Sequence, residues 1–156
     1  MYSSAIMAFV HHLAAFTVVA ALAVEVATFK PPLTLLQARR LRRTDAVFGA
    51  AAVAVLLAGL ARVTWFEKGP HYYWHDGFFL IKFAAFVLAA LVSIYPTVVI
   101  LSWLPALRSG NPPELTPACT RRVRLCLMFE LTAVLAILLC AAFMARGYGY
   151  LGATRD

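Results

Sequence analysis

Ionisable side chains interrupt stretches of this sequence that are otherwise apolar. Six of them lie inside these stretches, namely His11, His12, Glu25, Arg62, Lys82 and Glu130. An imidazole can ligate a metal ion, and guanidinium and ammonium groups bind carboxylates. This combination predicts a site for an amphipathic anion, and haem b fits it, with its axial histidine and propionates. A quinone headgroup is the second candidate ligand.

The elements that must position these side chains are membrane-spanning helices. Of the 156 residues, 63% are hydrophobic and 13% are charged, against roughly 45–50% and about 25% in a soluble globular domain. A hydrocarbon core of about 30 Å needs about 20 apolar residues in a helix. Four segments meet this requirement, namely residues 5–29, 46–66, 78–104 and 125–145. We therefore expect one all-α domain over residues 1–156, a four-helix transmembrane bundle in contact with the lipid bilayer.

Spacing and depth sort the charged groups into two layers. In each span, the ionisable residues and several small residues together follow a spacing of three and four residues. This spacing places them on one face of the helix. His12 is the exception, because it is turned about 100° from His11. The expected layers are His11, Arg62 and Lys82 in the outer third of the bilayer, and Glu25, Asp45 and Glu130 in the inner third.

Two interpretations of the outer layer stay open. In the first, His11 is the axial haem ligand, with His12 as the alternative, and Arg62 and Lys82 hold the propionates. Met144 has a suitable depth for a second axial ligand, although a methionine near a helix end is usually a packing residue. In the second interpretation, the two cations reach the interface or pair with the loop acids Glu67 and Asp76.

The inner layer also has two interpretations. In the first, Glu25 and Glu130 adjust the properties of the haem site or relay protons. They are then catalytic candidates together with Lys82. Alternatively, the inner acids are structural and pair with the nearby arginines, which are Arg39, Arg40, Arg42, Arg43, Arg121 and Arg124.

Basic residues indicate the orientation in the membrane. Residues 30–43 contain five Lys or Arg residues and no acid, whereas residues 67–76 contain only Lys68 as a fixed cation. Short loops rich in Lys and Arg stay in the cytoplasm. We therefore expect both termini on the outer, periplasmic side of a bacterial inner membrane. The net charge of +7 then belongs to the membrane flanks and does not indicate nucleic-acid binding.

A different metal site is possible in the outer loop. His71 and His75 are four residues apart, so they share a face if this loop is helical, and they form a half-site for zinc or copper. With Met144 they are the basis of one alternative, a copper-handling membrane protein, although no third ligand is evident in the loop. The other interpretation is an interfacial pair of solvated histidines. A further alternative is a non-enzymatic accessory or assembly subunit, in a homo-oligomer or a larger membrane complex. Motifs of soluble enzymes and of covalent haem attachment are not present in the sequence.

Several of these residues resemble the HemJ-type protoporphyrinogen oxidases, which are small four-helix membrane proteins. The resemblance rests on residues 8–12, on the basic segment before the second span, on residues 81–83 and on residues 129–132. It implies association with haem b, a functional histidine at His11 or His12, and a functional lysine at Lys82. It further implies an oxidoreductase that passes electrons from a porphyrinogen to a quinone.

The chain departs from the HemJ pattern at two places. It has Glu25-Val26 where those oxidases carry a Pro-Arg pair, and it has the additional outer loop of residues 67–75. This loop and residues 93–97 look closer to an uncharacterised bacterial family of four-span membrane proteins with a domain of unknown function. The resemblance therefore supports the fold and haem binding more directly than it supports the oxidase reaction.

Overall fold

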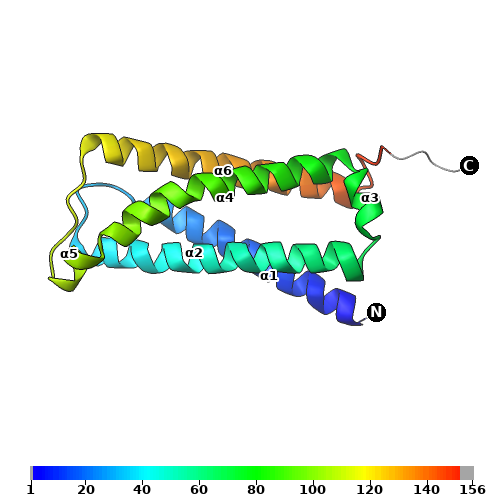
Figure 1. Cartoon of the computed structure of the whole chain (residues 1–156), viewed down its shortest axis with the longest axis horizontal. Helices are drawn as coiled ribbons and strands as arrows, with labels where there is room; N and C mark the ends of the chain where they lie inside the picture. The colour runs from blue at the N-terminus through cyan, green and yellow to red at the C-terminus, as the bar shows by residue number, and fades with distance from the viewer. Residues whose placement is uncertain (1, 152–156) are drawn as a thin grey trace, which may run out of the picture.

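The computed structural model describes residues 2–151 as an all-α bundle of four long and three short helices (Figure 1). Residues 1 and 152–156 of the expected domain lie outside this range. The elements are α1 (Tyr2–Thr28), α2 (Leu35–Ala61), the π-helical turn η1 (Arg62–Phe66), α3 (Pro70–Trp74), α4 (Gly77–Ser102), α5 (Leu104–Arg108) and α6 (Pro117–Ala145). The four long helices are apolar and long enough to span a membrane, which confirms the four-span bundle.

The long helices form two antiparallel pairs. α1 packs along α2, and α4 packs along α6, whereas contacts between the two pairs are fewer. The start of α1, the end of α6 and α3 lie at one end of the bundle, which we call the aromatic end (Figure 1). The connections at residues 29–34 and 109–116 lie at the opposite end, which we call the basic end because arginines flank both.

Two of the long helices begin at least eight residues earlier than the hydropathy pattern predicts. α2 starts at Leu35, so Arg39 and the following arginines are helical and do not lie in a loop. A capping box fixes this start: Gln37 N donates to Thr34 Oγ1 at 3.3 Å, and Thr34 N donates to Gln37 Oε1 at 2.9 Å. α6 likewise starts at Pro117, because the Thr116 side chain accepts a hydrogen bond from Cys119 N. The helices therefore extend beyond the apolar spans at the basic end.

The apolar core is concentrated in the half of the bundle toward the basic end. The best-buried large side chains there come from all four long helices and from the connections, and include Leu22, Leu41, Ile100, Trp103 and Val123. In the aromatic half, Phe79 is the only buried aromatic residue within the described part of the long helices, and small residues predominate. The two helix pairs are therefore fastened together mainly at the basic end.

Asp76 fixes the start of α4 at the aromatic end. Its side chain is 1% exposed, and its Oδ1 accepts a hydrogen bond of 3.0 Å from Phe79 N. We expect Asp76→Ala to lower the free energy of unfolding by about 1 kcal/mol, because the cap is lost. Asp76→Asn keeps an accepting oxygen and should stay within a few tenths of a kcal/mol of the wild type. Unfolding in mixed micelles measures both values, and equal stability of the alanine variant and the wild type would contradict this role.

Candidate functional site

The half-buried imidazole of His11 contacts the neighbouring helix α2. Its Nδ1 lies 3.2 Å from the carbonyl oxygen of Val55. A carbonyl oxygen can only accept, so Nδ1 carries the proton in this bond and Nε2 has its lone pair available. A hydrogen bond from one ring nitrogen to a backbone carbonyl is the usual way to orient a histidine that ligates a metal with the other nitrogen.

Gly59 makes room for this ring on α2. A Cβ atom at position 59 would lie 3.2 Å from His11 Cε1, whereas a Cβ atom at Gly49 on the same helix would meet nothing within 4 Å. The absence of a side chain at Gly59 therefore lets the ring approach α2 closely enough to reach the Val55 carbonyl. Close approach through a small residue is typical of helix packing in membranes.

The π-helical turn η1 places a cation beside this histidine. Arg62 begins the turn, and π-helical turns occur frequently at functional sites. Its Nη2 lies 2.6 Å from Glu67 Oε1, which is the one ion pair within residues 2–151. Tyr73 adds a long hydrogen bond of 3.5 Å to Glu67 Oε2. Burial, reinforced by the negative charge of Glu67, raises the pKa of Tyr73 to about 12, so its hydroxyl stays protonated and donates at neutral pH.

Lys82 is the second cation in this region and comes from the other helix pair. Its Nζ lies 5.4 Å from the centroid of the Phe79 ring, in cation–π geometry. No carboxylate in the described part of the chain forms an ion pair with it. Asp76, one expected partner, instead caps α4. Arg62 lies one turn after Gly59, which adjoins the His11 ring, and Lys82 approaches the same region from the other helix pair.

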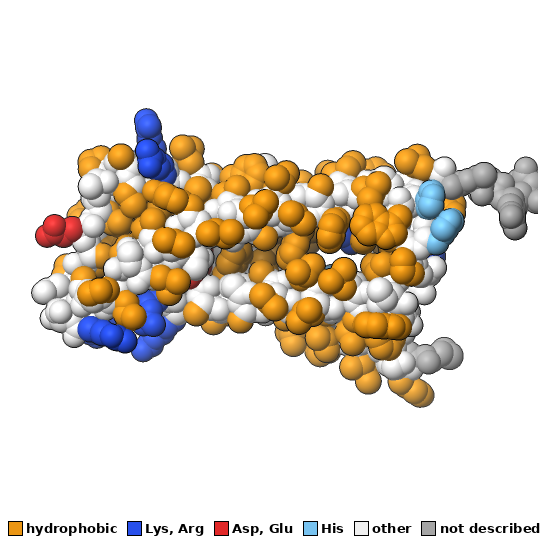
Figure 2. Space-filling view, viewed as in Figure 1, with side chains coloured by type: hydrophobic (Ala, Val, Ile, Leu, Met, Phe, Trp, Pro, Cys, Tyr) orange, Lys and Arg blue, Asp and Glu red, His pale blue; other side chains and the backbone are white. Residues whose placement is uncertain are grey.

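The two helix pairs separate toward the aromatic end of the bundle (Figure 1). Figure 2 shows a hollow between the α1–α2 pair and the α4–α6 pair, toward the aromatic end, with Lys or Arg side-chain atoms inside it. Aromatic rings close the bundle at this end: Tyr72 stacks on Tyr150 with centroids 4.6 Å apart, and Phe78 stacks on Phe143 at 5.0 Å. The amide of Gly77 donates to the Gly149 carbonyl, which ties the chain after α6 to the start of α4.

The other histidines lie outside this cluster. His12 is exposed on the surface of α1, although its ring is 6.0 Å from that of His11. The exposed rings of His71 and His75 are 4.4 Å apart, and His75 Nδ1 donates to the His71 carbonyl at 2.7 Å. Across residues 2–151, no group of three or more His, Cys, Asp or Glu side chains is arranged to hold a metal ion.

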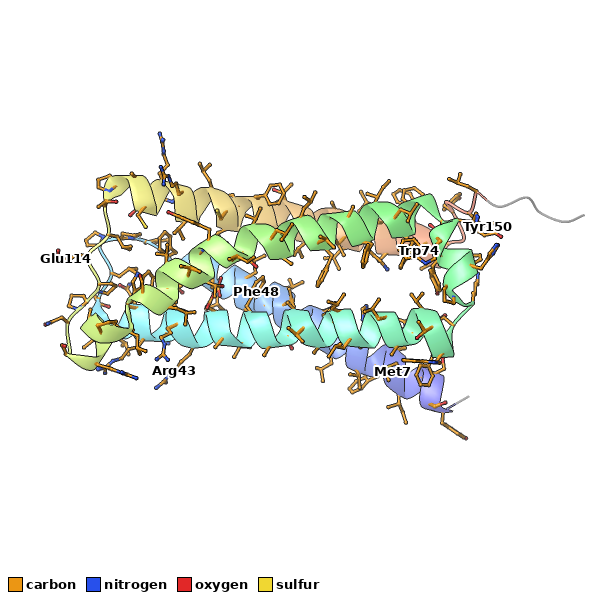
Figure 3. The ribbon with its side chains drawn as sticks, viewed as in Figure 1. Met7, Arg43, Phe48, Trp74, Glu114 and Tyr150 are labelled. Atoms are coloured by element: carbon orange, nitrogen blue, oxygen red, sulfur yellow. The ribbon has the colours of Figure 1, made fainter. Side chains whose placement is uncertain are left out.

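The inner acids form a second cluster nearer the basic end. Glu25, Asp45 and Glu130 are all buried, and the expected pairing with arginines is wrong, since none of the three forms an ion pair in the described range. The arginine side chains extend to the surface instead. Figure 3 shows Arg43 pointing away from the bundle, and Arg39 donates to the Leu107 carbonyl at 3.3 Å. Long cationic side chains reach the headgroup region more easily than they enter the core.

The two clusters are well separated along the helices. Asp45 meets Thr97, which is 15 residues beyond Lys82 on α4, so the clusters are roughly 22 Å apart at 1.5 Å per residue. Lys82 therefore does not act on the same atoms as Glu25 and Glu130. Of the three residues expected to be catalytic, Lys82 therefore lies toward the aromatic end, whereas Glu25 and Glu130 lie toward the basic end.

Comparison with known proteins identifies a family. Residues 3–149 match the family described as "Predicted membrane protein (DUF2214)". The chain belongs to this family. No curated protein and no solved structure matches it significantly. Membership agrees with the uncharacterised membrane family indicated by the outer loop, and with a multi-pass membrane protein.

Some contacts in this DUF2214 protein had no clear signal in the sequence. The partners of His11, which are Val55 and Gly59, belong to an apolar helix in which any of several residues has the right spacing. No motif marks Tyr73, because its bond to Glu67 depends on the turn between α2 and α3. Thr97 directly follows Pro96 on a predicted packing face, and this position is the one hint of its role.

Proposed function

We propose that this membrane protein binds haem b, or a related porphyrin, between its two helix pairs in the aromatic half. The observation that carries the proposal is the hydrogen bond from His11 Nδ1 to the Val55 carbonyl, which leaves Nε2 free to ligate iron. His12 is exposed on the helix surface, so His11 is the better candidate for the axial ligand.

The donor set of the cleft fits such a ligand, with one qualification. Lys82 is a half-buried cation without a carboxylate partner in residues 2–151, and an anionic propionate would supply that partner. Arg62 is already bound to Glu67, so a propionate can use it only by sharing or displacing that carboxylate. Lys82 is therefore the main propionate-binding cation in this proposal, and Arg62 is secondary.

The proposal extends to the reaction implied by the HemJ resemblance. A porphyrin-binding site with an unpaired lysine suits an oxidoreductase that takes electrons and protons from a porphyrinogen and passes them to a quinone. The bound haem would supply the electron transfer, and Lys82 would hold the porphyrinogen carboxylates. Because basic segments stay in the cytoplasm, the arginines support a cytoplasmic position for the basic end and a bacterial inner membrane as the location in this proposal.

The visible spectrum of the purified protein tests haem binding. After expression with ample haem, the wild type should show a Soret band in detergent. His11→Ala should lose the band, because the axial nitrogen is gone. His12→Ala is the matched control and should keep it, since this neighbouring ring lies outside the cleft. Lys82→Gln should keep a shifted band but bind haem more weakly.

Other outcomes separate the alternatives. A colourless wild type would contradict haem binding and favour an accessory or assembly subunit. A band that survives in His11→Ala and disappears in His12→Ala would place the ligand on the other helix face. Stoichiometric copper that is lost in a His71→Ala/His75→Ala variant would favour metal handling at the outer loop.

A further inference from the structure

Three carboxyl side chains from three different helices are buried together toward the basic end. Glu25 on α1 is 2% exposed, Asp45 on α2 is 6% exposed and Glu130 on α6 is 1% exposed. Leu22, Phe48 and Leu127, each three residues from one of these carboxyls on the same helix, pack in one core cluster, so the three groups share one region. Carboxyl groups at this depth are rare in membrane proteins and are usually functional.

No cation compensates this cluster within residues 2–151. The one ion pair in that range lies at the aromatic end, between Arg62 and Glu67. Glu25 Oε1 and Glu130 Oε1 are fully buried and have no hydrogen-bond partner. Three ionised carboxylates in a region of low dielectric constant would repel one another and would each lose their hydration. Neutral acids avoid most of this cost.

The fourth helix contributes a hydroxyl donor to the same cluster. Thr97 on α4 donates to Asp45 Oδ1 at 2.7 Å. Two threonines elsewhere in the spans donate to carbonyls of their own helix, Thr17 to Leu13 and Thr132 to Met128. Thr97 instead bonds across to another helix, directly after the buried Pro96, which lacks an amide proton. The Thr97 hydroxyl stabilises a negative charge on Asp45, whereas no comparable donor reaches Glu25 or Glu130.

We propose that Glu25, Asp45, Glu130 and Thr97 form an intramembrane proton-binding site. Asp45 carries the negative charge, and Glu25 and Glu130 hold protons at neutral pH. The titratable groups of the site are these three carboxyls and the half-buried Cys126 thiol, which lies one turn before Glu130 on α6. Glu25 lies in the last turn of α1, so the site exchanges protons at the basic end. It lies roughly 20 Å from His11 and does not depend on haem binding.

Infrared spectroscopy of the full chain in lipid nanodiscs tests this site directly. The wild type should show the carbonyl stretching band of protonated carboxyl groups at neutral pH, and the band should shift when H2O is replaced by D2O. Glu25→Gln and Glu130→Gln should each remove part of the band, and the double variant should remove nearly all of it. Glu114→Gln is the control, because Glu114 is exposed to solvent in the loop at the basic end, away from the buried cluster (Figure 3).

A second variant keeps every carboxyl group and guards against simple misfolding. Thr97→Val removes only the donor to Asp45, so the band should grow as Asp45 also becomes protonated. A wild type without the band at neutral pH would overturn the proposal, and so would a band that persists in the folded double variant. Loss of the band on adding sodium, but not choline, would show a cation site instead. None of these readouts requires a bound porphyrin.

Discussion

Substitution of Gly59 by alanine and then by leucine should weaken porphyrin binding in two steps. An added Cβ would lie 3.2 Å from His11 Cε1, so the ring must move away from α2 and its bond to the Val55 carbonyl lengthens. Loss of an orienting partner of a metal ligand typically costs roughly 10–100-fold in affinity. We expect the lower end of this range for Gly59→Ala and the upper end for Gly59→Leu, measured by haem titration in detergent.

Gly49 provides the matched control on the same helix. An added Cβ there meets nothing within 4 Å, so Gly49→Ala and Gly49→Leu should leave haem affinity unchanged. Nitrogen-15 NMR of labelled histidine gives a readout without haem: His11 should carry its proton on Nδ1 in the wild type, and Gly59→Leu should lose this preference. Equal haem affinities in the Gly59 and Gly49 variants would show that Gly59 and the bond from His11 to Val55 do not contribute to haem binding.

The residues that face the interior of the bundle could be predicted, because a membrane-spanning helix has few ways to place its ionisable side chains. Once the apolar lengths are recognised, the three- and four-residue spacing determines which residues face inward. Every residue predicted on the His11 face of α1 is buried or half-buried, from Ala8 to Glu25, and the same holds on α2 from Asp45 to Arg62. The convergence of His11, Arg62 and Lys82 then follows from their depths and from the alternating directions of the four spans.

Apart from the Arg62–Glu67 pair, which one of the two open interpretations included, the partners of the charged groups could not be predicted in the same way. Closeness in depth made the arginines natural partners for the inner acids, yet an arginine on the outer side of its helix reaches the headgroups more easily than the bundle interior. Whether Arg62 turns toward Glu67 depends on the π-helical turn, which no residue pattern announced. The capping box at Thr34 and Gln37 is recognisable in the sequence, and it shows that the arginines of α2 are helical.

The uneven core links the two proposed sites. Large side chains fasten the helix pairs together around the carboxyl cluster, where water must be excluded for the protons to stay bound. Small side chains near His11 leave the pairs apart, where a ligand needs space. The same bundle can therefore hold a rigid polar site and an open cleft, because each lies in the half whose packing suits it.

Truncation of Leu22 should have the largest effect on stability. This side chain is 0% exposed and lies in the core cluster with Leu41 and Val123, one turn before Glu25 on α1. We expect Leu22→Ala to lower the free energy of unfolding by about 2–5 kcal/mol, because the lost contacts leave a cavity. Unfolding by sodium dodecyl sulfate in mixed micelles measures the change.

Leu13 on the same helix is the control, because it is 55% exposed and faces the surroundings of the bundle. Leu13→Ala should change the stability by less than about 0.5 kcal/mol, since lipid or detergent fills the space that the side chain leaves. Haem affinity should survive in Leu22→Ala, because His11 lies 11 residues away on α1. Equal destabilisation by the two substitutions would mean that the half nearer the basic end is not the packed half of the bundle.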